Sequence, residues 1–168
     1  TRYATLFPYT TLFRSQMKKL SYSLRAVLMI VGLYFSNYAL AEMSYFSVAE
    51  NGAIMYDAPS LKAGKQYVVS LYYPVEMIVD VENWAKVRDS NGVLAWIEKK
   101  ALSDKRYVVV TAPIASVHQA PDTNSVLLFQ AEQNVVMEWM DADNPGWIKV
   151  RHLDGQTGYV KSIQVWGS

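Results

Sequence analysis

Residues 147–160 read WIKVRHLDGQTGYV, and residues 84–97 read WAKVRDSNGVLAWI, 63 positions earlier. In both stretches a Trp-x-Lys-Val-Arg run is followed by a turn dipeptide, Asp154-Gly155 or Asn91-Gly92, and then by an aromatic residue. The run alternates polar and apolar residues, as a half-buried strand does. Asn-Gly and Asp-Gly tolerate the positive φ angles of a tight hairpin. The two stretches therefore predict the same β-hairpin twice.

The repetition extends beyond the hairpins. Residues 45–59 read YFSVAENGAIMYDAP and return as YVVVTAPIASVHQAP at 107–121, with the opening tyrosine, an internal alanine and the closing Ala-Pro pair unchanged. A unit of about 60 residues occurring twice indicates two tandem domains. We place them at 42–105 and 106–168, and the short linker at 104–106 favours a compact tandem.

Strand signals dominate both copies, because short runs rich in β-branched and aromatic residues alternate with turns. We expect the Ala-Pro pairs at 58–59 and 120–121 to end the first strand of each copy, since proline cannot donate into a ladder. A single helical turn is expected at 99–103 and at 161–164. The sequence therefore predicts an all-β protein of two tandem small barrels, each with about five short strands and one helical turn. The further expected strands are 67–69, 75–79, 84–88 and 94–97, then 107–111, 126–129, 135–140, 147–152 and 158–160.

The N-terminal residues do not fit this pattern. Residues 5–15, TLFPYTTLFRS, resemble the translation of a short-read sequencing adapter, so we interpret residues 1–16 as an artefact; the alternative is an unusual natural N-terminus. From Met17 a basic segment with two lysines is followed by an apolar run at 26–35 and a small-residue site at 39–41. This is the pattern of a secretory signal peptide, which we expect to be cleaved after Ala41. An uncleaved anchor is the alternative, although the run is shorter than the roughly 20 apolar residues of a membrane span.

Charge and cysteine content exclude several classes of function. Residues 42–168 keep 11 of the 16 Lys and Arg residues and all 15 Asp and Glu residues, so their formal net charge is −4. This charge argues against nucleic acid as a partner and against binding to anionic lipid surfaces. The chain contains no cysteine, so an exported protein of this sequence must be held together without disulfides.

Residues suited to catalysis or metal binding are few. The two histidines, His118 and His152, correspond to Tyr56 and Asp89 in the other copy and have no acidic partner at metal-ligand spacing. A turn with two aspartates at 141–143 is a weaker candidate for calcium than for a solvated turn. No Gly-x-Ser-x-Gly or phosphate-loop motif occurs. We therefore expect no enzymatic activity, no cofactor and no metal.

Aromatic residues remain as candidates for ligand binding. Rings that line a groove suit extended peptides and glycan faces; the alternative is that most of these rings belong to the core. Tyr72 and Tyr73 form a pair that the second copy lacks, so they either bind ligand or pack against the other barrel. The expected ligand-binding residues are Tyr56, Tyr72, Tyr73, Trp84, Trp96, Trp147 and Tyr159.

Each half resembles a bacterial Src-homology-3-like (SH3-like) domain of the cell-envelope type. The resemblance is clearest in the second copy, and the first copy departs from it at Asn83 and Ala95, where the family has glycine. It implies a non-catalytic binding or targeting module in an exported, periplasmic protein of Gram-negative bacteria, with peptidoglycan peptide, glycopeptide or a partner protein as ligand. The alternative function is a structural or assembly partner of an envelope complex through an exposed apolar face. The matching motifs are Pro121, Gly146-Trp147-Ile148-Lys149-Val150, Asp154-Gly155 and Gly158-Tyr159-Val160.

Overall fold

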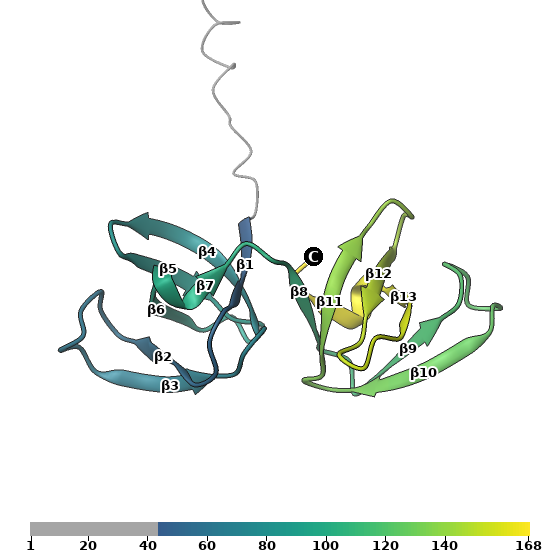
Figure 1. The fold of residues 1–168 in the computed structure, drawn as a ribbon, viewed down its shortest axis with the longest axis horizontal. Coiled ribbons are helices and arrows are strands. Elements are labelled where there is room, and N and C mark those ends of the chain that lie inside the picture. The colour runs from purple at the N-terminus through teal and green to yellow at the C-terminus, as the bar shows by residue number, and fades with distance from the viewer. Residues whose placement is uncertain (1–43) are drawn as a thin grey trace, which may run out of the picture. The chain divides into compact units, whose positions relative to one another are not determined.

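The computed structural model describes residues 44–168 of the chain. The artefact expected at 1–16 and the signal peptide expected at 17–41 lie outside these residues. Within the described part the regular structure is β-strand, apart from two single turns of 3₁₀ helix (Figure 1). The strands form two separate antiparallel sheets of seven strands each, and this confirms the predicted all-β tandem.

The first sheet takes all its strands from the first copy of the repeat. Its order is β3-β2-β6-β5-β4-β1-β7, and the 3₁₀ turn η1 at Lys99–Ala101 links β6 to β7. The strands are β1 (Ser44–Val48), β2 (Ala53–Tyr56), β3 (Lys65–Val69), β4 (Pro74–Val81), β5 (Trp84–Arg88), β6 (Leu94–Glu98) and β7 (Leu102–Ser103).

The second sheet repeats this order strand for strand. It runs β10-β9-β13-β12-β11-β8-β14, and η2 at Ser162–Gln164 precedes its last strand. Both helical turns thus lie where the sequence predicts them. The strands are β8 (Tyr107–Val110), β9 (Ile114–His118), β10 (Leu127–Glu132), β11 (Val136–Asp141), β12 (Trp147–Arg151), β13 (Thr157–Lys161) and β14 (Val165–Trp166).

The two predicted hairpins join β5 to β6 and β12 to β13. Gly92 and Gly155 at their turns have φ angles of 83° and 98°, values that only glycine adopts without strain. Main-chain hydrogen bonds elsewhere also recur between the copies: Asp57 N donates to Gly64 O, as Gln119 N donates to Val126 O. The repeat read from the sequence is therefore a repeat of backbone geometry.

One detail of the predicted strands is wrong. The Ala-Pro pairs at 58–59 and 120–121 follow the second strand of each copy, not the first. The chain breaks between β1 and β2 because Gly52 adopts a φ angle of 79°, and in the second copy Pro113 lies in the matching break between β8 and β9. Together with the two-residue strands β7 and β14, this break explains why each sheet has seven strands where about five were expected.

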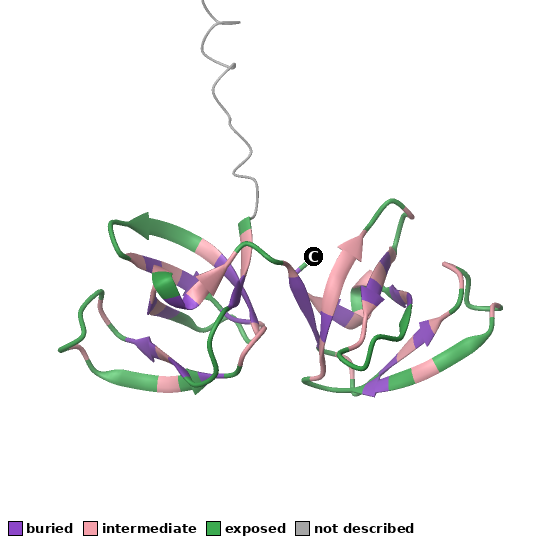
Figure 2. Cartoon of the chain, viewed as in Figure 1, coloured by how far each residue is buried: buried purple, intermediate pink, exposed green. Residues whose placement is uncertain are grey.

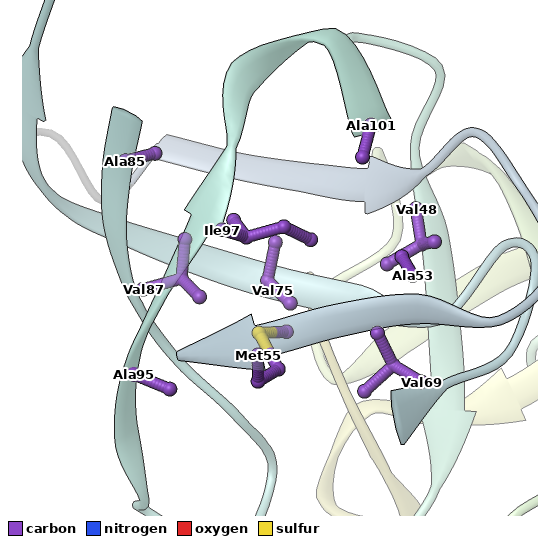
Figure 3. Close-up of a cluster of buried hydrophobic side chains, with 10 residues drawn as sticks. All are labelled: Val48, Ala53, Met55, Val69, Val75, Ala85, Val87, Ala95, Ile97 and Ala101. Atoms are coloured by element: carbon purple, nitrogen blue, oxygen red, sulfur yellow. The ribbon is translucent and has the colours of Figure 1, made fainter. Parts of the chain in front are cut away.

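Each sheet encloses its own hydrophobic core. Buried residues alternate with exposed ones along the strands (Figure 2), as β5 shows with Ala85 and Val87 inside. The first core takes side chains from β1 to β6 and from η1 (Figure 3). Aliphatic residues fill it, whereas all five tryptophans of the chain are partly exposed. The tryptophan rings therefore contribute less to the two cores than the aliphatic side chains do.

The two cores use the same positions with different residues. Met55 and Val75 in the first core correspond to Val117 and Met137 in the second, and all four side chains are fully buried. The large and the small residue have exchanged strands. Because packed interiors have the density of crystals, this exchange keeps the volume of each core nearly constant.

Several aromatic contacts join residues of the two copies around the linker. The guanidinium of Arg106 lies 4.4 Å from the ring centroid of Trp139 and 5.6 Å from that of Tyr45. The ring of Tyr45 also meets that of Trp166 edge-to-face, with centroids 5.3 Å apart. Burial lowers the pKa of Arg106 from its ordinary value, although guanidinium remains charged at all physiological pH values.

Candidate functional site

An aromatic cluster covers the outer side of the first sheet, on β2, β5 and β6. Tyr56 and Trp84 meet edge-to-face, with ring centroids 5.3 Å apart and planes at 89°. Trp96 is the cross-strand neighbour of both Tyr56 and Lys86, and the Lys86 ammonium lies 6.0 Å from its ring centroid. We call these four residues the first aromatic face. Three predicted site residues thus come together.

The second sheet carries the same arrangement on β9, β12 and β13. His118 meets Trp147 edge-to-face at 5.7 Å and 83°, as Tyr56 meets Trp84. Tyr159 is the cross-strand neighbour of His118 and Lys149, and the Lys149 ammonium lies 5.9 Å from its ring centroid. We call these four residues the second aromatic face. It unites the predicted residues Trp147 and Tyr159.

The remaining predicted pair, Tyr72 and Tyr73, lies apart from the first aromatic face. Tyr72 has a positive φ angle of 69° in the turn before β4, and its ring stacks on that of Tyr107 with centroids 4.5 Å apart. The Tyr73 hydroxyl lies 2.7 Å from the Ser90 hydroxyl, and its ring packs against the first core. Both side chains are half-buried, and Tyr72 makes the contact with the other copy that we gave as the alternative to ligand binding.

A buried carboxylate organises the first hairpin. Asp89 is 6% exposed and accepts hydrogen bonds from the backbone N–H groups of Asn91 and Val93 and from the Tyr67 hydroxyl. Burial, together with the negative charge of Asp89, raises the pKa of Tyr67 well above its ordinary value. The hydroxyl of Tyr67 therefore stays protonated and ties β3 to the hairpin.

The same position in the second hairpin has different chemistry. His152 replaces Asp89 there, and Phe129, at the position of Tyr67, meets the His152 ring at 5.6 Å. His152 Nδ1 lies 3.0 Å from a carboxylate oxygen of Asp154. The Gln156 N–H and His152 together lower the pKa of Asp154. The histidine thus lies at a hairpin turn, beside an exposed carboxylate.

Next to the first aromatic face lies a small pocket. Its volume is about 90 Å³, and the lining residues are Glu50, Gly52, Ile54, Tyr56, Ile97, Glu98 and Ala101. Tyr56 belongs to both the face and the pocket, and Trp84 is the cross-strand neighbour of Glu98. At the equivalent position of the second copy, Lys161 holds its ammonium 5.9 Å from the Trp147 ring centroid. The two aromatic faces therefore have neighbours of opposite charge.

Sequence reasoning missed the residues that distinguish the two faces. Lys86 and Lys149 were treated only as strand residues, and the pocket residues Glu50 and Glu98 were not considered. The signal was present in the alignment of the two copies, where Glu98 corresponds to Lys161.

Residues 44–168 contain no cluster of three His, Asp or Glu side chains placed to hold a metal ion. The same part of the chain has no helix with the length and apolarity needed to span a bilayer.

Comparison with protein families gives one match, which covers both copies. The model of the family described as "Bacterial SH3 domain" matches residues 49–104 and again residues 111–167. Each range covers one of the two sheets except for its first strand, β1 or β8. A comparison with curated proteins gave no match.

Among solved structures, the chain is similar to proteins of the NlpC/P60 type. NlpC2 from Trichomonas vaginalis is 15% identical with a TM-score of 0.34, over 77% of this chain and 50% of that structure. NlpC1 from the same organism is 13% identical, also at 0.34, over 79% and 49%. An NlpC/P60 family protein from Bacillus cereus ATCC 10987 is 14% identical at 0.34, over 74% and 57%. The chain thus spans roughly half the length of these structures.

Proposed function

The chain belongs to the bacterial SH3 domain family, and from this premise we propose that it is a non-catalytic binding protein of the cell envelope. Its ligand is cell-wall peptide or glycopeptide, bound at the two aromatic faces. The segment at 17–41, with its basic start and apolar run, supports export to the periplasm.

The observation that carries the proposal is that the aromatic face occurs twice with nearly the same geometry. Edge-to-face ring pairs at 5.3 and 5.7 Å and lysines at 6.0 and 5.9 Å from a neighbouring ring recur at equivalent positions. Apart from Tyr56, which is 6% exposed, the rings are partly exposed, and none of them belongs to the two core clusters, so core packing does not explain why aromatic rings recur at these positions. A partly exposed ring beside a cation offers an apolar surface together with a charge for peptide groups.

Co-sedimentation with purified peptidoglycan sacculi tests the proposal. We expect the protein to pellet with sacculi. The double variant Trp96→Ala/Tyr159→Ala should remain largely in the supernatant, because it removes one ring from each aromatic face. Leu153→Ala is the control, since this side chain is 63% exposed at a hairpin tip. Equal pelleting of the double variant would show that the faces do not bind the wall, and failure of the parent protein to pellet would reject a cell-wall ligand.

A second candidate function, an assembly partner in an envelope complex, is favoured by one observation. Val126, just before β10, and Leu127 and Leu128, its first two residues, are 62%, 49% and 41% exposed, and β10 is an edge strand of its sheet. Exposed edges of this kind pair readily with other chains. Site-specific photocrosslinking from position 127 in cells would capture a single partner protein under this function and none under the first.

A further inference from the structure

The pocket beside the first aromatic face has an apolar floor and an acidic rim. Ile97 and Ala101, which Figure 3 shows within the first core, form its floor. Glu50 and Glu98 contribute the carboxylates. A volume of about 90 Å³ exceeds the roughly 10–15 Å³ needed for one water, so the pocket has room for a small polar group and part of its aliphatic chain.

The pocket depends on residues that the second copy has exchanged. Gly52 leaves open space where the second copy has Ile114, and Glu50 and Glu98 correspond to Ala112 and Lys161. The correspondence is fixed by matching hydrogen bonds, because Ala49 N donates to Ala101 O as Thr111 N donates to Gln164 O. The first copy alone therefore combines the open space with two negative charges.

Tyr56 adds a hydroxyl to the residues that line this pocket. Tyr56 lines the pocket and is only 6% exposed, yet its hydroxyl makes no hydrogen bond to any other residue between 44 and 168. A ligand that donates a hydrogen bond in the pocket would satisfy it.

An ammonium group of the chain itself already lies at the rim. Lys100 Nζ is 3.0 Å from a Glu98 carboxylate oxygen. The hydrogen bond to Glu98 raises the pKa of Lys100, and Glu98, Glu50 and Tyr56 add to the effect electrostatically. The Lys100 side chain is 70% exposed, so the ion pair is weak and easily replaced. The same three groups that line the pocket thus favour a positive charge.

We propose that this pocket binds the primary ammonium group of a ligand, carried on an aliphatic chain like that of lysine. The inference rests on the proposed binding function and specifies one chemical feature of the ligand. An alkylammonium has three N–H donors, which match the carboxylates of Glu50 and Glu98 and the hydroxyl oxygen of Tyr56. Its methylene groups contact Ile54 and the apolar floor, and Lys100 gives up its place to the ligand.

Titration of the protein with short peptides, followed by NMR of the backbone amides, tests the proposal. The probe is acetyl-Gly-Lys-Gly-amide, compared with the same peptide acetylated on the lysine Nε. We expect the unmodified peptide to shift the amides of Gly52 and Ala101, and the acetylated peptide to leave them in place. Glu98→Gln should weaken binding about tenfold, the scale of one charge-assisted hydrogen bond, whereas Lys100→Met should strengthen it at least twofold.

Matched controls separate pocket binding from general attraction of cations. Glu132→Gln removes the same charge from an exposed position and should leave binding unchanged, as should Lys161→Met in the second copy. Equal responses to both peptides, or weakening by Glu132→Gln as large as by Glu98→Gln, would overturn the pocket assignment.

Failure of the ammonium site and failure of the cell-wall function give different experimental results. If the protein pellets with sacculi but ignores the lysine peptide, the ammonium site is wrong and the cell-wall function stands. If the lysine peptide shifts the amides of Gly52 and Ala101 but the protein does not pellet with sacculi, the ammonium pocket is correct and its ligand is not part of the cell wall.

Discussion

Gly158 and Ala95 occupy equivalent positions in β13 and β6, but only the first must be glycine. A Cβ atom added at Gly158 would lie 2.6 Å from Val117 Cγ1 and 2.8 Å from the His118 carbonyl oxygen. Contacts this short force the neighbours to move, and the carbonyl oxygen belongs to the backbone of a paired strand. In the first copy Ala95 is accommodated at 1% exposure, so the two barrels differ locally in strand spacing.

Substitution at these two positions should lower the stability for different physical reasons. We expect Gly158→Ala to lower the free energy of unfolding by about 1–3 kcal/mol, the usual cost of overpacking. The reverse change in the first copy, Ala95→Gly, should cost about 1–2 kcal/mol, from backbone entropy and the loss of a buried methyl group. Urea denaturation followed by tryptophan fluorescence measures both, and an unchanged midpoint for Gly158→Ala would contradict the steric argument.

Tyr67 should make the thermal stability of the protein depend on pH in the alkaline range. Its pKa is raised in the folded state by burial and by Asp89, so the folded protein holds the phenol proton more tightly than the unfolded chain. A raised pKa stabilises the fold fully below the unfolded value of about 10, and the contribution is lost as the pH rises beyond it. We therefore expect thermal stability to fall above about pH 10, and Tyr67→Phe to make the fall shallower.

The second copy provides the internal comparison, because Phe129 already stands at this position. Thermal unfolding monitored by circular dichroism between pH 8 and 12 is the measurement. If the thermal stability of Tyr67→Phe falls as steeply with pH as that of the parent protein, other groups are responsible for the loss of stability at alkaline pH.

At the scale of elements, β4–β5 and β11–β12 carry the same cross-strand ion pair in different surroundings. Glu76 is 5% exposed and accepts two hydrogen bonds from Arg88, both 2.8 Å long. The side chain of its counterpart Glu138 is 22% exposed and lies 3.6 Å from Arg151 and 3.3 Å from Lys105. Bidentate pairs with arginine are stronger than single contacts, so the two pairs should contribute unequally.

We expect Glu76→Ala to destabilise the protein by about 2–4 kcal/mol, since it removes two charge-assisted bonds and opens a buried site. Glu138→Ala should cost less, about 1 kcal/mol, because both of its cationic partners are largely exposed. Differential scanning calorimetry of the two variants decides the point: equal losses would mean that burial of the carboxylate does not matter.

The elements predicted best from the sequence are those with their own turn chemistry. Asn91-Gly92 and Asp154-Gly155 identified both hairpins, because the preference of Gly for positive φ is local. The break between β1 and β2 escaped prediction, since Gly52 lies within a run that reads as one strand. The aromatic faces were predicted only in part: the rings are visible in the sequence, but which rings meet depends on the register of β2 against β6.

At the scale of the whole molecule, Arg106 in the linker contacts residues of both copies. Its guanidinium stacks near Tyr45 and Trp139, and Nη2 donates to the carbonyl oxygen of Gly167 at 3.0 Å. We expect Arg106→Ala to lower the melting temperature and to separate one unfolding transition into two, because the copies then unfold independently. Arg106→Lys should not restore the parent behaviour, since an ammonium lacks the planar stacking surface. A single unshifted transition in the calorimeter would refute this role.

The exchange of large and small residues between the two cores has a consequence for misfolding. Tandem domains of similar sequence are prone to swapping equivalent strands during folding. If β9 entered the first core in place of β2, Val117 would face Val75 and leave a void, while Met55 would crowd Met137 in the second core. Voids and overpacking each cost several kcal/mol. The inverted placement of methionine and valine therefore disfavours the exchange of β2 and β9 between the two sheets, although both sheets have the same backbone arrangement.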